Sequence, residues 1–152
     1  MKSHPCFHLA IPVDDLETTV KFYAEVLNCK VGRSSKHSVI LNFFGHQLVV
    51  HKSDEPIPKQ KGIYPRHFGL VVDEASDWEE IASHLEDKGI EFVIEPGVKH
   101  LGEITEYRTM FFQDPSGHHI EIKTYKNQEA RFEPLKEASL GLDEERDPPR
   151  RC

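Results

Sequence analysis

The sequence predicts an α+β fold made of two modules, each with one strand, one helix and three further strands in that order. The main observation is a repeat: the stretch FHLAIPVDD, which begins at Phe7, returns in form as RHFGLVVDE, which begins at Arg66. Each stretch has a histidine before a short apolar run and ends in two acidic residues. A segment with apolar residues at helical spacing follows each of them, and three strand-like runs follow each helix.

Strand alternation assigns a direction to the two repeated histidines. Successive side chains of a strand point to opposite faces. Phe7, Leu9 and Ile11 are therefore expected to face the first helix, with His8 on the other side. In the second stretch the apolar face begins at Phe68, which turns His67 away from the helix. We expect the sheets of the two modules to line a shared cavity into which both histidines point.

The helices carry predicted start and stop signals. Asp14 with Glu17, and Ser76 with Glu79, have the spacing of capping boxes. Left-handed stops are expected at Asn28 and Gly89. The strands predicted after the helices are CKVGR, SVILNFF and HQLVVHK in the first module, and EFVIE, YRTMFFQ and HHIEIKTY in the second.

A single domain is expected over residues 1–126 of the 152-residue chain. Its first module spans about 5–51, a polar, proline-bearing linker spans 52–63, and its second module spans about 64–125. The tail, 127–152, loses apolar periodicity and is expected to be largely disordered at its end.

Composition narrows the function classes. The formal charge of −7 and the lack of a basic stripe argue against nucleic acid as a partner. The apolar runs are shorter than the roughly 20 residues of a membrane helix, and the first residues do not have the apolar stretch expected of a signal peptide. Three cysteines without close spacing indicate neither a disulfide framework nor a thiolate zinc site. We expect a cytoplasmic protein that acts on a small-molecule substrate.

The same alternation turns Glu121 toward the cavity, together with Lys123. A carboxylate in a strand centre is costly to desolvate unless it is protonated, paired or bound to a cation. His8, His67 and Glu121 form a set of two imidazoles and one carboxylate, as found in three-ligand metal sites with open positions. The simpler alternatives are a hydrogen-bonded core histidine at each strand start and a Glu121–Lys123 pair.

Further residues are candidates for the site. His51 is expected on the inward face of its strand. There it would be either a fourth metal ligand or a general base. Aligning Gly45 with Gly117 sets Val49, rather than His51, opposite Glu121. Substrate contacts are expected from four polar residues: Asn42, Gln47, Arg108 and Lys123.

The two repeated stretches, together with MFFQDPSGHHIEI near the end, resemble the vicinal oxygen chelate superfamily over residues 5–125. This superfamily includes glyoxalase I, bleomycin-resistance proteins, fosfomycin-resistance enzymes and extradiol dioxygenases. The resemblance implies paired βαβββ modules around a divalent metal, with His8, His67 and Glu121 at the usual ligand positions and His51 nearest to the extra ligand of glyoxalases. It also implies a homodimer, with modules that close within one chain or swap between two.

The function implied by this resemblance is a metal-dependent enzyme acting on a small oxygen-chelating substrate. We favour a dioxygenase-like oxidoreductase with Fe(II) or Mn(II), in which His51 is a catalytic base rather than a ligand. The alternatives are a glyoxalase-like isomerase or lyase, with Ni(II) or Zn(II), a resistance-type transferase, and a binding module without catalysis. Phe111 stands where extradiol enzymes have a tyrosine, which argues against ring cleavage by their mechanism.

Overall fold

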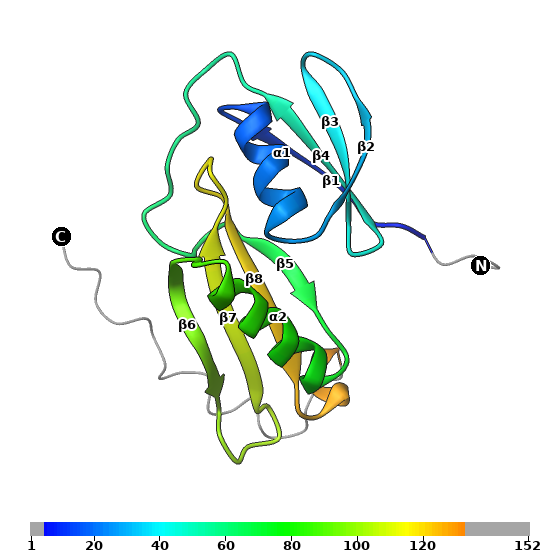
Figure 1. Cartoon of the computed structure of the whole chain (residues 1–152). Helices are drawn as coiled ribbons and strands as arrows, with labels where there is room; N and C mark the ends of the chain where they lie inside the picture. Colours follow the sequence, from blue (N-terminus) through cyan, green and yellow to red (C-terminus); the bar gives the residue numbers. More distant parts are fainter. Residues whose placement is uncertain (1–4, 133–152) are drawn as a thin grey trace.

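The computed structural model describes residues 5–132 and contains two modules of the same design (Figure 1). The first module runs through five elements: β1 (His8–Val13), α1 (Leu16–Glu25), β2 (Lys30–Ser34), β3 (Ser38–Phe43) and β4 (His46–Lys52). Its four strands form a sheet in the order β1-β4-β3-β2. β1 is parallel to β4, and the other neighbours are antiparallel.

The second module repeats this plan with β5 (Phe68–Val71), α2 (Ala75–Asp87), β6 (Phe92–Lys99), β7 (Tyr107–Gln113) and β8 (His119–Tyr125). Its sheet has the order β5-β8-β7-β6, again with one parallel pair, β5 and β8. The predicted α+β fold of two βαβββ modules is therefore confirmed. Among the described residues, no helix is long and apolar enough to cross a membrane.

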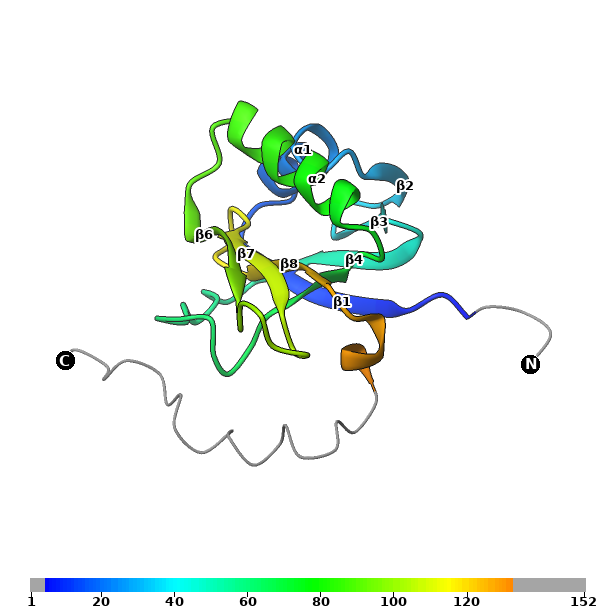
Figure 2. The same cartoon turned by 90° about the horizontal axis from the view of Figure 1, so that it is seen from below.

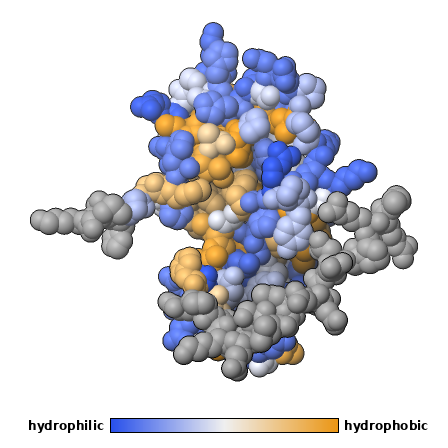
Figure 3. Space-filling view, turned by 180° about the vertical axis from the view of Figure 1, so that it is seen from behind, coloured by the Kyte–Doolittle hydropathy of each residue, from blue (hydrophilic) through white to orange (hydrophobic). Residues whose placement is uncertain are grey.

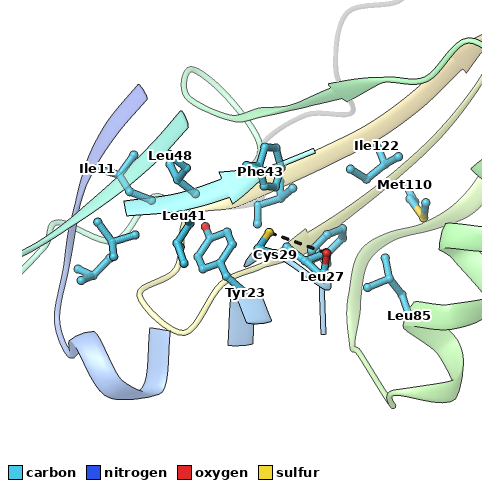
Figure 4. Close-up of a cluster of buried hydrophobic side chains, with 14 of the residues drawn as sticks. Ile11, Tyr23, Leu27, Cys29, Leu41, Phe43, Leu48, Leu85, Met110 and Ile122 are labelled. Carbon is cyan, nitrogen blue, oxygen red and sulfur yellow. Dashed lines mark hydrogen bonds between the residues drawn. The ribbon is translucent and has the colours of Figure 1, made fainter. Parts of the chain in front are cut away.

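The helices cover one side of the molecule and the sheets form the other (Figure 2). Strand alternation places the apolar side chains as predicted, because Ile11, Leu48 and Ile122 are buried beneath the helices. Phe7 is an exception, since it precedes β1 and is 62% exposed, with its ring edge-on to His46. The buried residues of both modules form one core, part of which is shown in Figure 4.

The two helix ends agree with prediction better than the two helix starts. Asn28 and Gly89 both have positive φ, at 53° and 69°, as left-handed stops. At the start of α1, however, the cap is Asp15, which accepts a bond from the Thr18 amide, and not Asp14. The predicted capping box of α2 is also wrong, because its N-cap is Glu74, without a side-chain bond.

Buried polar contacts join the modules. The hydroxyl of Tyr23 on α1 donates to Oδ2 of Asp114, in the turn before β8, at 3.0 Å. In the same region the Asp14 amide donates to the Ser116 hydroxyl at 3.0 Å. Burial raises the pKa of the Asp114 carboxyl above its ordinary value, while its hydrogen bonds oppose this change. The two modules are thus held together at the end of the molecule where β8 begins.

The residues just after β8 are ordered into a short 3-10 helix, η1 (Gln128–Arg131). Gln128 donates to the carbonyl of Asp73 at 2.6 Å, and Arg131 pairs with the Asp73 carboxylate at 2.8 Å. The beginning of the predicted tail therefore contacts the turn between β5 and α2. The end of that tail, predicted to be disordered, lies outside the described residues.

Candidate metal centre on the second sheet

His67 lies immediately before β5, on the face of the second sheet that is turned away from α2. Its Nδ1 is 2.9 Å from the carbonyl oxygen of Ile63. A carbonyl oxygen can only accept, so Nδ1 carries a proton, and in the neutral imidazole Nε2 is the nitrogen with a lone pair. That Nε2 is 3.5 Å from Oε2 of Glu121. A backbone acceptor that fixes the tautomer in this way is typical of metal-binding histidines.

Glu121 stands at the centre of β8, opposite Gly69 of β5 and Phe111 of β7. Its side chain is only 12% exposed. Oε1 accepts from the hydroxyl of Thr109 at 2.8 Å and from the ammonium of Lys123 at 3.1 Å. The other oxygen, Oε2, is the one that faces His67. Oε1 is thus held by two protein donors, while Oε2 lies beside Nε2 of His67.

Aromatic rings lie beside His67 and beside Lys123. The ring of Phe111 meets that of His67 edge-on, with centroids 5.3 Å apart. The ammonium of Lys123 lies 4.7 Å from the centroid of Tyr107 and 5.5 Å from that of Tyr125. Burial lowers the pKa of Lys123, but the charge of Glu121 and the hydrogen bond to it outweigh this effect, so the pKa is raised. Lys123 is therefore held as an ammonium beside the carboxylate.

His8 begins β1, an edge strand of the first sheet, and is exposed. Its Nδ1 is 2.6 Å from Oε1 of Gln47, the residue beside it on β4. An amide oxygen only accepts, so His8 also carries its proton on Nδ1 and leaves the Nε2 lone pair free. Gln47, predicted as a substrate contact, thus orients His8.

Two of the three predicted metal ligands meet in one chain. Within residues 5–132 no group of three histidine, cysteine, aspartate or glutamate side chains converges on one point. His67 and Glu121 lie together, whereas His8 stands apart on the first sheet. The donor types fit a divalent first-row metal, since each histidine offers Nε2 and Glu121 offers Oε2.

The other predicted site residues are spread over the molecule. Exposed His51 is four residues along β4 from Gln47, which is about 13 Å at the rise of a strand. Asn42 accepts from the Gly45 amide at 2.7 Å and so closes the β3–β4 turn. The guanidinium of Arg108 bonds to Glu79 and lies over the ring of Trp78 on α2.

Arg108 is therefore on the helix side of the second sheet, the same side as the buried Met110. The structure does not bring it to the site, because side chains on alternate positions of β7 point to opposite faces. Thr109, the next residue, has the opposite direction and reaches Glu121. Sequence reasoning missed this threonine. Pairing β7 with β8 across the DPSG turn sets Thr109 directly beside Lys123 and could have identified it.

A cleft of about 390 Å³ opens beside His67, between β1, the linker and the start of β8. Its polar lining includes Arg66, His118 and His119, and its apolar lining includes Leu9 and Ile57. Burial lowers the pKa of His119, as do the nearby His67 and His118. His67 is thus the residue that the cleft and the candidate metal centre have in common.

Comparisons with known proteins identify the family of the chain. Residues 6–122 match the family described as the glyoxalase/bleomycin resistance protein/dioxygenase superfamily. The chain belongs to this family. The match covers both modules, including all three predicted ligands.

Individual relatives include the virulence protein STM3117 of Salmonella typhimurium, which is 28% identical over 119 residues, or 78% of this chain and 82% of that protein. The metallothiol transferase FosB of Staphylococcus epidermidis is 24% identical over 118 residues, or 77% and 79% of the two chains. Among solved structures, a glyoxalase/bleomycin resistance protein/dioxygenase from Alicyclobacillus acidocaldarius has a TM-score of 0.80 at 34% identity, covering 87% of this chain and all of that one.

Proposed function

We propose that the protein is a divalent-metal-dependent enzyme that acts on a small, oxygen-chelating substrate at a site shared by two copies of the chain. His67 and Glu121 of one copy and His8 of the second copy would hold the metal. The observation that carries this proposal is the matched state of the two histidines. In each, Nδ1 faces an oxygen acceptor, so Nε2 is the nitrogen that can bind a metal in the neutral ring.

The second copy is required because His8 does not reach the pair within its own chain. β1 and β5 are both edge strands, so each can receive a neighbour. Ala10 and Pro12 are exposed beside His8 on β1. Figure 3 shows apolar residues gathered in the middle of the face behind the view of Figure 1, framed by hydrophilic ones. A two-fold dimer that covers this surface would form two equivalent sites.

The strand register supports three protein ligands rather than four. Glu121 pairs with Gly69, two residues after His67. The equivalent pair in the first module, two residues after His8, is Ala10 with Val49. The position in the first module that matches Glu121 therefore carries an apolar side chain, which cannot serve as a fourth ligand. Three ligands leave positions for a chelating substrate, and the metal would polarise its oxygens as a Lewis acid.

Within this class, the side chains near the pair favour redox-neutral addition or group transfer. The ring against His67 belongs to Phe111, which cannot donate or accept a proton. The protic groups nearest Glu121, on Thr109 and Lys123, are both engaged with its Oε1. FosB, one of the relatives, is named a metallothiol transferase. Oxygenase chemistry is the second candidate, because a three-ligand site also has room for dioxygen.

Subunit mixing tests the shared site. His8→Ala and Glu121→Ala chains, each purified and freed of metal, are expected to lose Mn(II) binding, because each lacks one of the three proposed ligands. In a heterodimer of the two variants, one site lacks both His8 and Glu121, whereas the other site has all three ligands. Mixing them should therefore restore binding at one site per dimer. No recovery in verified heterodimers would show that the site lies within one chain, and unchanged binding by the single variants would overturn the metal proposal.

The reaction class is tested with the loaded wild-type protein. Mn(II)-dependent addition of a thiol to a small epoxide carrying an anionic group, under anaerobic conditions, would support group transfer. Substrate-dependent oxygen uptake by the Fe(II) form, without thiol addition, would instead support the oxygenase. The Phe111→Tyr variant introduces a phenol hydroxyl beside His67 and serves as a comparison in both assays.

A further inference from the structure

The carboxylate of Glu121 is held unequally at its two oxygens. Oε1 accepts two hydrogen bonds, from Thr109 at 2.8 Å and from Lys123 at 3.1 Å. Oε2 faces Nε2 of His67 at 3.5 Å and has none of these donors. One oxygen of this carboxylate accepts hydrogen bonds from an ammonium group and from a hydroxyl group. Because these bonds fix the orientation of the carboxylate, they also fix the direction of its other oxygen.

The two donors are themselves fixed by the fold. Thr109 and Lys123 are directly opposite each other in the β7–β8 register, on the same face of the sheet as Glu121. Thr109 is only 3% exposed. The Lys123 ammonium is confined by the rings of Tyr107 and Tyr125, and such cation–π contacts favour a charge held over the ring face. This arrangement leaves the lysine little freedom to turn to a substrate.

We infer that Thr109 and Lys123 are positioning residues that hold Oε1 of Glu121, so that the carboxylate binds the metal through Oε2 alone. This inference rests on the proposed function and deepens it. It reassigns Lys123 from a substrate contact to the support of a metal ligand. It also assigns a role to Thr109, which was not among the predicted site residues.

Single-oxygen ligation has a chemical consequence. A carboxylate bound through both oxygens takes two coordination positions, whereas one bound through Oε2 takes one. The position thus left open is available to a second oxygen of the substrate. Partners of this kind, one step removed from the metal, typically contribute 10- to 100-fold in metal affinity.

The test measures Mn(II) affinity and the carboxylate infrared bands of the apo and metal-loaded full-length protein. Thr109→Val removes the hydroxyl at nearly constant shape and is expected to weaken Mn(II) binding about 10-fold or more. The separation of the two carboxylate stretching bands should shift toward that of two-oxygen ligation. Thr109→Ser keeps the hydroxyl and should restore both readouts.

Thr124 provides a matched control on β8. It is also buried, at 3% exposure, but its hydroxyl has no hydrogen-bond partner among the described residues. Thr124→Val should therefore leave Mn(II) affinity and the infrared bands unchanged. If Thr109→Val and Thr124→Val behave alike, the positioning role of Thr109 is wrong.

The Lys123→Met variant distinguishes a lysine that positions Glu121 from one that acts only through its positive charge. A lysine that acts only through its charge repels a dication, so its removal would tighten Mn(II) binding. A lysine that positions Glu121 gives the opposite result, weaker binding with altered carboxylate bands. Tighter binding, or binding within twofold of wild type, would overturn the inference for Lys123.

The proposed function and this inference fail in different ways. If His67→Ala and Glu121→Ala keep their metal, the proposed function is wrong. If these two variants lose metal while Thr109→Val and Lys123→Met bind it as wild type does, the metal centre stands and the positioning inference alone is overturned.

Discussion

The two modules share one architecture, but they differ at matched positions on the faces turned away from the helices. Two residues after its histidine, the first module has Ala10 beside Val49, and the second has Gly69 beside Glu121. The first module therefore offers His8 with no carboxylate at the matched position, while the second offers His67 together with Glu121, whose Oε1 is held by Thr109 and Lys123. The comparison teaches that an internal repeat can preserve a fold while its candidate ligands are divided unequally between the two modules.

Gly69→Ala should disrupt the sheet of the second module, and we expect it to have the largest effect on stability. A Cβ built at Gly69 would lie 1.7 Å from the carbonyl oxygen of Glu121. That overlap involves backbone on a paired strand, so it can be relieved only by separating β5 from β8. We expect a loss of more than about 4 kcal/mol in the free energy of unfolding, measured by chemical denaturation.

Ala10→Gly is the matched change in the first module. Ala10 already carries a Cβ beside Val49, so the substitution removes a methyl group and adds backbone freedom. It should cost only about 0.5 to 1 kcal/mol. If the two changes have similar costs, the closer approach of strands in the second module does not constrain residue 69.

Tyr23→Phe tests the joint between the modules, with a smaller expected effect. Tyr23 is fully buried in the core (Figure 4) and donates to Asp114. Loss of its hydroxyl leaves the buried Oδ2 of Asp114 without this donor, at a cost of about 1 to 3 kcal/mol in unfolding free energy. Tyr64→Phe, which changes an exposed tyrosine, is the control and should cost much less.

The buried phenol of Tyr23 also predicts a pH dependence of the stability, which the Tyr23→Phe variant would lack. Burial, and then the charge of Asp114, raise the pKa of Tyr23 well above its ordinary value of 10.0. The folded state therefore favours the neutral phenol. The resulting stabilisation is complete below pH 10 and is lost as the pH rises through the folded-state pKa. The stability of wild type should fall more steeply than that of Tyr23→Phe just above pH 10, and parallel curves would contradict this assignment.

Ending the chain after Lys126 should have only a small effect, because it removes only Asn127, η1 and the residues that follow. The fold should persist with a loss of about 1 kcal/mol, since the contacts of Gln128 and Arg131 with Asp73 are few and partly exposed. Arg131→Ala in the full chain isolates the ion pair and should cost less than the truncation. A loss above about 3 kcal/mol on truncation would show that η1 belongs to the core of the second module.

Strand alternation predicted most of the fold because it depends on local spacing. β4 and β7 begin and end at the predicted residues, and the inward direction of Glu121 follows from Ile120 and Ile122 facing the helix. Helix caps were less predictable, since Asp14 and Asp15 are adjacent and either can accept the first free amide. Glu79 was assigned to a cap but pairs with Arg108 from a distant strand.

The candidate site was predictable in its residue types and less so in its assembly. Alternation gives each side chain a face, but it does not say how two sheets are placed relative to each other. The separation of His8 from His67 depends on that placement. The hydrogen bond from Thr109 to Glu121 likewise depends on the register of β7 against β8, which the hydrophobic pattern alone leaves open.

The contrast between two cysteines offers a practical use. Burial raises the pKa of Cys29 to about 12, so its thiol is almost entirely protonated near neutral pH and reacts poorly with alkylating reagents. Cys6 is exposed and lies two residues before His8, at the margin of β1. With Cys152 replaced, a fluorophore attached to Cys6 would report selectively on events at the edge of the first sheet, without a signal from the core.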